Sequence, residues 1–123
     1  MLVARIKANL AQYGRLKQTD RRRQPQIRIG SILLQQAARR VFVDGREIAL
    51  KNKEYELLLF LMLNVDIVFS KEALYERIWG YDAMEDSATV AVHINRLREK
   101  IEQDPSSPRY IQTVWGTGYR FKP

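Results

Sequence analysis

The chain has 123 residues, of which 46% are hydrophobic, enough for one ordinary domain with a core and a short appendage. The absence of cysteine excludes disulfides and thiol chemistry, and the single histidine argues against a zinc site, so we expect no metal and no cofactor. No apolar run approaches the ~18 residues of a membrane span, and no signal-peptide pattern opens the chain. We therefore expect a cytoplasmic protein without a membrane partner.

The net charge of +7 invites binding to a polyanion, but the charge is unevenly distributed. Residues 1–26 hold seven basic residues and one acid, whereas residues 27–123 hold 14 basic and 13 acidic residues. Residues 88–123 carry six basic and three acidic residues, a local net charge of +3. The high pI therefore reflects mainly the front segment, and any nucleic-acid footprint at the C-terminal end is modest.

The first 26 residues are predicted to form a short helix and a linker. The helix, over 1–14, has one apolar side made of Leu2, Val3, Ile6, Leu10 and Tyr13. A helix this short is marginal alone, so we expect it to pack on a partner surface. Residues 15–26 are polar and basic, with Arg21-Arg22-Arg23 and Pro25, and are typical of a linker.

Residues 27–50 are predicted to form a small antiparallel sheet of about four strands. Short apolar runs place the strands at 27–29, 32–34, 40–43 and 47–50. Turn signals at Gly30-Ser31 and Asp44-Gly45 separate them, and an Asp-Gly pair between two apolar runs is a strong hairpin signal.

Three helices are predicted after the sheet. The first, over 52–64, has a broad apolar face and should form the centre of the core. The second should begin after Ser70 as its N-cap, run to about Trp79 and end at Gly80. Residues 81–86 form an acidic loop, and Asp86 or Ser87 caps the third helix.

The third helix combines a buried stripe with a basic outer face. Val90, Ile94, Leu97 and Ile101 recur at spacings of four, three and four residues, so they should face the core. This phase directs outward Ala88, Val92, Asn95, Arg96 and Glu99. It places Thr89, His93 and Lys100 on one flank, and Ala91 and Arg98 on the other.

Asp104-Pro105 and Pro108 end the third helix. After this break, residues 110–114 and 119–121 are predicted to be the two strands of a terminal hairpin. Its tip consists of Trp115, Gly116, Thr117 and Gly118. A small sheet, three helices and a hairpin constitute a winged helix-turn-helix, an α+β fold.

A helix that can enter a groove beside a hairpin that can reach the next one suits duplex DNA. Arg96 can bond both major-groove acceptors of guanine, Asn95 can pair with adenine or take a phosphate, and Val92 can touch a thymine methyl. Thr89, His93 and Arg98 suit phosphates, which position a helix without reading sequence. The alternative is an ordinary surface helix with solvated basic residues, against which the small outward side chains of Ala88, Ala91 and Val92 argue.

Enzymatic chemistry is not expected. The sequence shows no Ser or Cys nucleophile with a His partner, no phosphate-loop motif and no ligand cluster. Gly116 and Gly118 lie in a hairpin rather than between a strand and a helix, so they are not a nucleotide-binding fingerprint.

Residues 27–121 resemble the DNA-binding effector domain of OmpR/PhoB-type bacterial response regulators. The matching motifs are Glu54–Leu58, Ile78–Gly80, Thr89–Arg98 and Thr113–Phe121. Residues 1–10 resemble the last helix of that family's receiver domain. The resemblance thus divides the chain into a receiver remnant (1–14), a linker (15–26) and a winged-helix domain (27–123).

The resemblance implies sequence-specific binding to double-stranded DNA and transcriptional regulation, as the output domain of a two-component phosphorelay. The third helix (87–102) would lie in the major groove and the wing (110–121) at the minor groove, with further phosphate contacts from Lys100, Thr113, Tyr119 and Arg120. Two copies would bind direct repeats as a tandem dimer, controlled by the receiver domain and a sensor kinase. RNA polymerase would meet the loop residues Tyr81, Asp82, Glu85 and Asp86.

Two other functions remain open at this point. The domain could be mainly an interaction module that docks RNA polymerase through the 80–86 loop, with DNA contact secondary. Alternatively, the basic front segment could bind polyanions or a membrane surface without sequence specificity.

The chain departs from the family pattern at several positions. Ala88 and Ala91 stand where the family often has Arg and Asp. Trp115 stands where many members place an arginine for the minor groove, so we expect its indole to pack on sugars or, preferably, on the wing itself. Lys51 replaces a threonine that usually caps the first helix, which predicts a helix start shifted to Asn52.

Overall fold

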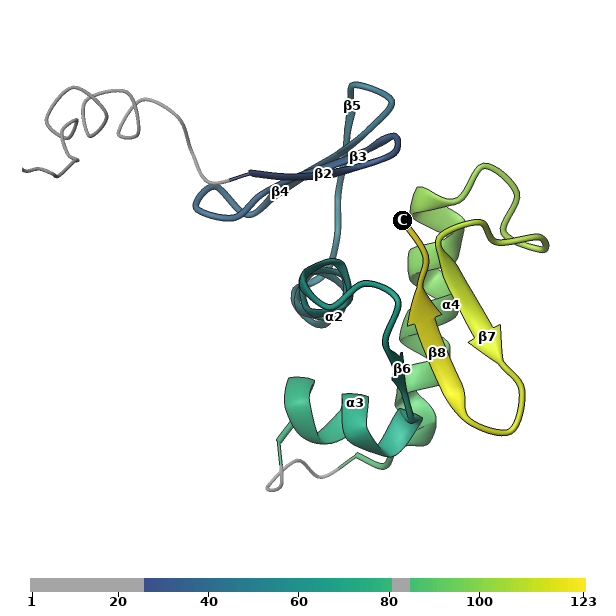
Figure 1. Ribbon diagram of the computed structural model, residues 1–123. Coiled ribbons are helices and arrows are strands. Elements are labelled where there is room, and N and C mark those ends of the chain that lie inside the picture. The colour runs from purple at the N-terminus through teal and green to yellow at the C-terminus, as the bar shows by residue number, and fades with distance from the viewer. Residues whose placement is uncertain (1–25, 81–84) are drawn as a thin grey trace, which may run out of the picture.

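The structure, a computed structural model, describes residues 26–80 and 85–123 (Figure 1). Its elements in chain order are β2 (Gln26–Ile29), β3 (Ile32–Gln35), β4 (Arg40–Val43), β5 (Arg46–Ile48), α2 (Asn52–Leu63), β6 (Val68–Phe69), α3 (Lys71–Ile78), α4 (Ala88–Ile101), β7 (Ile111–Val114) and β8 (Gly118–Phe121). The helix predicted over 1–14 and the linker predicted over 15–26 lie outside the described residues, apart from Gln26, which opens β2. The sheet, the three helices and the hairpin confirm the predicted α+β winged helix-turn-helix.

Strands β2 to β5 form an antiparallel sheet in chain order, as predicted. Their register aligns a cross-strand row of apolar residues on the core side, namely Ile27, Leu34, Val41 and Ile48. The predicted Asp44-Gly45 hairpin is confirmed, because φ is 53° at Asp44 and 78° at Gly45, as a turn with two left-handed residues requires. The fourth strand ends at Ile48 rather than at the predicted residue 50, since the chain leaves the sheet there to reach α2.

Helix α2 is the centre of the core. Figure 1 shows it end-on between the β2–β5 sheet above and α3 below. Leu57, Leu58 and Leu61 are fully buried. Burying three leucines contributes on the order of 2 kcal/mol each to the free energy of folding, which makes this helix the main organiser of the domain.

Helix α2 begins at Asn52, the first residue of the predicted range, but its capping differs from the prediction. Lys51, not Asn52, is the N-cap residue, and its side chain forms no capping hydrogen bond, since an ammonium has no acceptor. Glu54 compensates: its Oε1 accepts the backbone N–H of Lys51 at 3.0 Å. Half of a capping box is therefore enough to begin the helix at Asn52.

Helices α3 and α4 begin as expected. The Ser70 Oγ accepts the N–H of Ala73 at 3.0 Å, which confirms Ser70 as the N-cap of α3. At α4 the Asp86 carboxylate accepts the N–H of Ala88 at 2.8 Å, whereas the Ser87 side chain forms no capping bond. The two candidate caps of α4 are thereby distinguished.

The wing belongs to a second antiparallel sheet in the order β6-β8-β7. Its middle strand runs very close to β6, because a Cβ atom added at Gly118 would lie 2.0 Å from the Phe69 carbonyl oxygen. Only glycine permits this approach, so Gly118 fixes β8 against the helical part of the domain.

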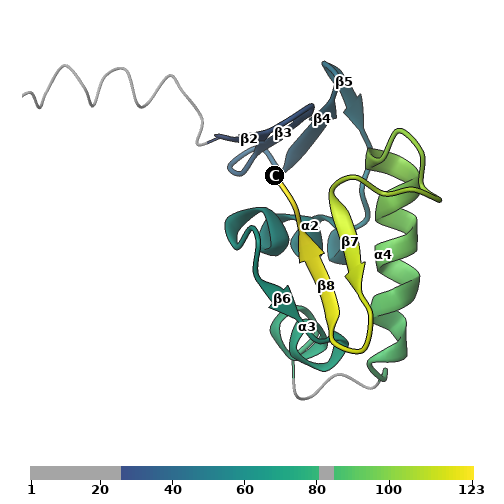
Figure 2. The ribbon, with the colours of Figure 1, turned by 45° about the vertical axis from the view of Figure 1, so that its right-hand side comes forward.

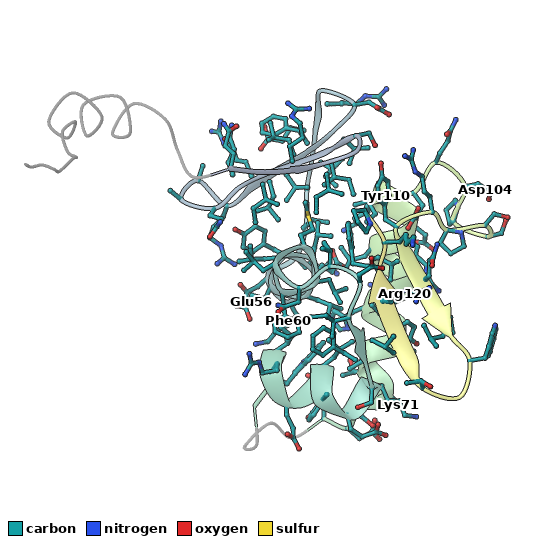
Figure 3. The ribbon with its side chains drawn as sticks, viewed as in Figure 1. Glu56, Phe60, Lys71, Asp104, Tyr110 and Arg120 are labelled. Atoms are coloured by element: carbon teal, nitrogen blue, oxygen red, sulfur yellow. The ribbon has the colours of Figure 1, made fainter. Side chains whose placement is uncertain are left out.

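Tyr110 connects the hairpin to the β2–β5 sheet and lies between them (Figure 3). Its hydroxyl accepts the backbone N–H of Ser31 at 2.9 Å and lies 3.0 Å from the Ser31 Oγ. The Glu102 carboxylate, 7% exposed, accepts the backbone N–H groups of Arg109, Tyr110 and Ile111. Glu102 and Tyr110 therefore set where β7 begins.

Candidate nucleic-acid interface

The outer face of α4 is the face that its sequence predicts. Val90, Ile94, Leu97 and Ile101 are buried. Asn95 and Arg96 are exposed, and Val92 is 48% exposed. Figure 2 shows α4 along one side of the domain, with the hairpin beside it and the hairpin tip at the same end as the start of the helix.

One flank of α4 faces α3 and holds His93 in a fixed orientation. The Nδ1 atom lies 2.8 Å from the Thr89 carbonyl oxygen, which can only accept, so Nδ1 carries the hydrogen and Nε2 is left for another contact. The ring meets Trp79 edge-on, with centroids 4.9 Å apart and an interplanar angle of 80°. Trp79 in turn stacks on Tyr75 at 5.5 Å. Trp79 thus packs between α3 and α4.

The same flank brings Lys100 to α2. Its ammonium lies 2.7 Å from Oε1 of Glu54, a carboxylate that is only 1% exposed. Burial alone would raise the pKa of Glu54, but the hydrogen bond and charge of Lys100 and the N–H of Lys51 hold the pKa below its ordinary value. Lys100, predicted as a phosphate contact, is therefore engaged inside the protein in neutralising a buried charge.

The opposite flank of α4 faces the wing and carries Arg98. Its Nε and Nη2 donate to the Ile111 carbonyl oxygen at 3.0 and 2.9 Å, and Nη2 also donates to Thr113 Oγ1 at 2.8 Å. Burial lowers the pKa of the guanidinium, while Tyr119 and Glu102 raise it; arginine nevertheless stays charged at neutral pH. Two of the predicted phosphate contacts, Arg98 and Thr113, thus bond to each other.

The remaining predicted wing residues lie on two opposite faces of the hairpin. Thr113 pairs with Tyr119 across the strands on the face toward α4, and Gln112 pairs with Arg120 on the other face. Arg120 donates from Nη2 to the Gln112 side chain at 3.2 Å. Within the described chain, its Nε is buried without a hydrogen-bond partner. Arg120 therefore lies on the opposite side of the hairpin from Arg98.

The tip of the wing presents Trp115 to solvent. Val114 and Gly118 close the hairpin, so Trp115, Gly116 and Thr117 form a three-residue loop. The Trp115 residue is 89% exposed, so the expectation that its indole packs on the wing is wrong. The reason is geometric: at the apex of a hairpin no neighbouring strand or helix covers the side chain.

The acidic loop before α4 is described only in part. Glu85 and Asp86 are exposed, the Glu85 carbonyl oxygen accepts a hydrogen bond from the Tyr75 hydroxyl, and Asp86 caps α4. Tyr81 and Asp82 lie outside the described residues. The structure thus gives Asp86 a structural task in addition to its predicted contact role.

In residues 26–80 and 85–123, no group of three or more His, Asp or Glu side chains is arranged to hold a metal ion. None of the helices in these ranges is both long and apolar enough to cross a bilayer.

Sequence reasoning did not foresee three of these arrangements. They are the ion pair of Glu54 with Lys100, the Arg98 bonds to β7 and the Glu102 carboxylate against three N–H groups. None of the three leaves a local signal, because each joins groups from different elements of the fold.

Comparison with known proteins identifies the family. Residues 45–121 match the family described as "Transcriptional regulatory protein, C terminal". The transcriptional regulatory protein YvrH of Bacillus subtilis is 40% identical over 122 residues, covering 99% of this chain and 51% of that protein. The response regulator SaeR of Staphylococcus aureus is 40% identical over 108 residues, covering 88% of this chain and 47% of that protein. The chain thus spans about half the length of these two relatives.

Solved structures agree with this relationship. The response regulator DrrB of Thermotoga maritima, an OmpR/PhoB homologue, superposes with a TM-score of 0.75 and 37% identity, over 89% of this chain and 50% of that one. The DNA-binding domain of RstA from Klebsiella pneumoniae, solved in complex with the RstA box, gives a TM-score of 0.70 and 30% identity, over 79% of this chain and 96% of that one. The chain belongs to the OmpR/PhoB-type response regulators and contains their C-terminal winged-helix DNA-binding domain.

Proposed function

We propose that the domain binds specific sites in double-stranded DNA and regulates transcription as the output domain of a two-component response regulator. The observation that carries this proposal is the outer face of α4, where Arg96 and Asn95 are exposed. The wing lies beside this helix, with its tip at the same end of the domain as the start of α4 (Figure 2). The RstA domain, 30% identical to this chain, was solved bound to its DNA box, which supports the same use of the fold here.

The proposed base contacts come from the exposed centre of α4. Arg96 would bond guanine through both arms of its guanidinium, Asn95 would pair with adenine or take a phosphate, and Val92 would touch a thymine methyl. Ala88 and Ala91 beside them are small, so the helix backbone can approach the groove closely.

Phosphate contacts are proposed at the edges of this face. His93 is held by Thr89 and Trp79, which leaves Nε2 as the ring nitrogen that would donate to a phosphate oxygen. This contact requires the imidazolium form, in which both ring nitrogens carry a hydrogen. Thr89 and Tyr119 are proposed on the same side, and Arg120 is proposed as a phosphate contact from the opposite face of the hairpin. Lys100 and Arg98 are not among the proposed phosphate contacts, because both are bonded to other residues of the protein.

The proposed wing contact is an uncharged one. Trp115 would pack its exposed indole on sugars at the minor groove, since an indole cannot supply the cation that a narrow, electronegative groove favours. Gly116 and Thr117 would lie beside it at the tip.

The remaining assignments concern the whole regulator. We propose that it acts in the cytoplasm and is controlled by its receiver domain and a sensor kinase. Two copies would bind direct repeats in tandem, and the 80–86 loop would meet RNA polymerase. The role as mainly a polymerase-docking module is not favoured, because the family and the RstA complex both point to DNA. No catalytic activity is proposed.

Selection of bound sequences from a random duplex pool tests the proposal. The expected result is enrichment of one motif, repeated at a spacing of about one helical turn if two copies bind in tandem. A pool that stays random after several rounds, with binding that disappears at moderate salt, would show only the non-specific electrostatic term.

A further inference from the structure

Arg98 lies on the flank of α4 that faces the wing and connects the helix to strand β7. The guanidinium uses two of its nitrogen atoms on the Ile111 carbonyl oxygen, at 3.0 and 2.9 Å, and reaches Thr113 Oγ1 at 2.8 Å. A planar fork bonded at two points along β7 fixes both a distance and an angle. We propose that Arg98 is a positioning residue, which clamps the wing to α4 and thereby affects DNA binding through the wing rather than by touching a phosphate.

The topology explains why β7 needs such a clamp. In the order β6-β8-β7, strand β7 is at the edge and pairs with β8 alone. Strand β8 is held on its other side by β6, where Gly118 closely approaches Phe69. Nothing equivalent lies beyond β7 in the described sheet, so the connection to α4 falls to side chains, and Arg98 supplies three hydrogen bonds there.

The clamp reaches close to the wing tip. Thr113 lies two residues before Trp115, which is 89% exposed at the apex. The Arg98 guanidinium also lies over the Tyr119 ring at 5.8 Å, so it contacts both strands of the hairpin. A binding group loses most of its value when its support lets it move by about 1 Å, so the clamp decides how well the tip meets a groove.

A second connection ties the clamp to the reading face. Arg98 Nη1 lies 3.4 Å from the Asn95 side-chain oxygen, a long hydrogen bond to a proposed base-contacting residue. Arg98 therefore links the outer face of α4, the edge strand β7 and Tyr119 of β8 in one chain of contacts.

The inference rests on the proposed DNA binding, but its structural part is testable without DNA. Nitrogen-15 relaxation of the backbone amides of 111–121 reports motion of the wing on the picosecond to nanosecond timescale. The indole N–H groups of Trp115 and Trp79 report the tip and an internal reference. The variants are Arg98→Ala and Arg98→Lys, in the whole chain, with folding checked by urea denaturation.

Lysine is the informative substitution because it separates the two roles of Arg98. It keeps the positive charge, which a phosphate contact needs, but lacks the two-armed fork, which the clamp needs. Thr113→Val, which removes only one acceptor, should loosen the wing less than either Arg98 variant. Glu99→Gln is the control, since it changes the charge of the same helix at an exposed position that takes no part in the clamp or in the Glu54 ion pair.

DNA titrations with the same variants complete the test. We expect both Arg98→Lys and Arg98→Ala to weaken binding to a selected site by roughly tenfold. A loss of this size corresponds to about one charge-assisted hydrogen bond between the wing and DNA. In both variants, the amides near Thr113 and the Trp115 indole should gain mobility, while the Trp79 indole and the wing of Glu99→Gln keep the mobility of the parent chain.

Two results would overturn the proposal. Wing relaxation unchanged in both Arg98 variants would show that the clamp does not hold β7. Affinity of Arg98→Lys equal to that of the parent chain would assign Arg98 to a phosphate. If the parent chain itself selects no DNA sequence, the proposed function fails, and the relaxation data still decide the clamp.

Discussion

The Lys100 ammonium lies 2.7 Å from the Glu54 carboxylate, which is almost fully buried beneath it. This ion pair joins the C-terminal half of α4 to the first turn of α2. A residue that the sequence places among candidate DNA contacts thus serves the packing of the two helices, and several consequences can be measured.

Removing the Lys100 charge should destabilise the domain. Lys100→Met keeps the apolar stem but leaves the Glu54 carboxylate with only the Lys51 N–H, at an expected cost of about 1–3 kcal/mol in the free energy of unfolding. Urea denaturation of this variant and of Lys100→Met with Glu54→Gln measures it. The double variant should recover part of the loss, and no recovery would mean that the pair is not the cause.

The same pair predicts a pH dependence. Because the folded pKa of Glu54 lies below its ordinary value of 4.5, its contribution is fully present above that pH and is lost as pH falls through the folded pKa. Stability of the parent chain should therefore fall more steeply than that of Glu54→Gln as the pH is lowered below about 5. Glu99→Gln, at an exposed position of α4, is the control and should follow the parent curve.

Much of the domain could be predicted from sequence because the information was local. The buried stripe of α4 follows from the positions of four apolar residues within one helix. The Asp44-Gly45 hairpin follows from two adjacent residues. The flanks of α4 could not be assigned in this way. Lys100 meets a residue 46 positions away and Arg98 one 13 positions away, so their partners depend on how separate elements pack. A basic side chain beside a groove-reading face looks the same in sequence whether it meets a phosphate or a buried carboxylate.

Gly30 should resist substitution because of its contact with Tyr110. Its φ is 57°, and an added Cβ atom would lie 2.3 Å from the Tyr110 hydroxyl oxygen. Gly45 has a φ of 78° but open space around it, so Gly45→Ala isolates the backbone strain of about 1 kcal/mol. We expect Gly30→Ala to cost about 1–3 kcal/mol more than Gly45→Ala in the free energy of unfolding. Equal losses in the free energy of unfolding for the two variants would show that the Tyr110 contact does not restrict Gly30.

Glu102 should be worth more to stability than its place near the surface suggests. Glu102→Gln loses a charge that three backbone N–H groups share, so we expect a loss of about 1–3 kcal/mol in the free energy of unfolding. Amide hydrogen exchange at Tyr110 and Ile111 should accelerate at the same time. Unchanged exchange at these two amides would contradict the assigned role.

Trp115 gives a direct test of the uncharged wing contact. Trp115→Ala should weaken binding to a selected site several-fold while changing the free energy of unfolding by no more than about 0.5 kcal/mol, as expected of an exposed residue. Trp115→Arg should steepen the dependence of the logarithm of affinity on the logarithm of salt concentration by about 0.9, one extra phosphate contact. An unchanged salt slope for Trp115→Arg would place the tip away from DNA.

The most direct test of the central claim, that α4 reads sequence, is a titration of the parent chain and Arg96→Ala against a selected duplex. The titration is repeated on the three single-base-pair variants at each position. The account predicts a loss of about 1–3 kcal/mol on the parent duplex and a loss of discrimination at one position only. An Arg96→Ala variant with the affinity and the base preferences of the parent chain would contradict it.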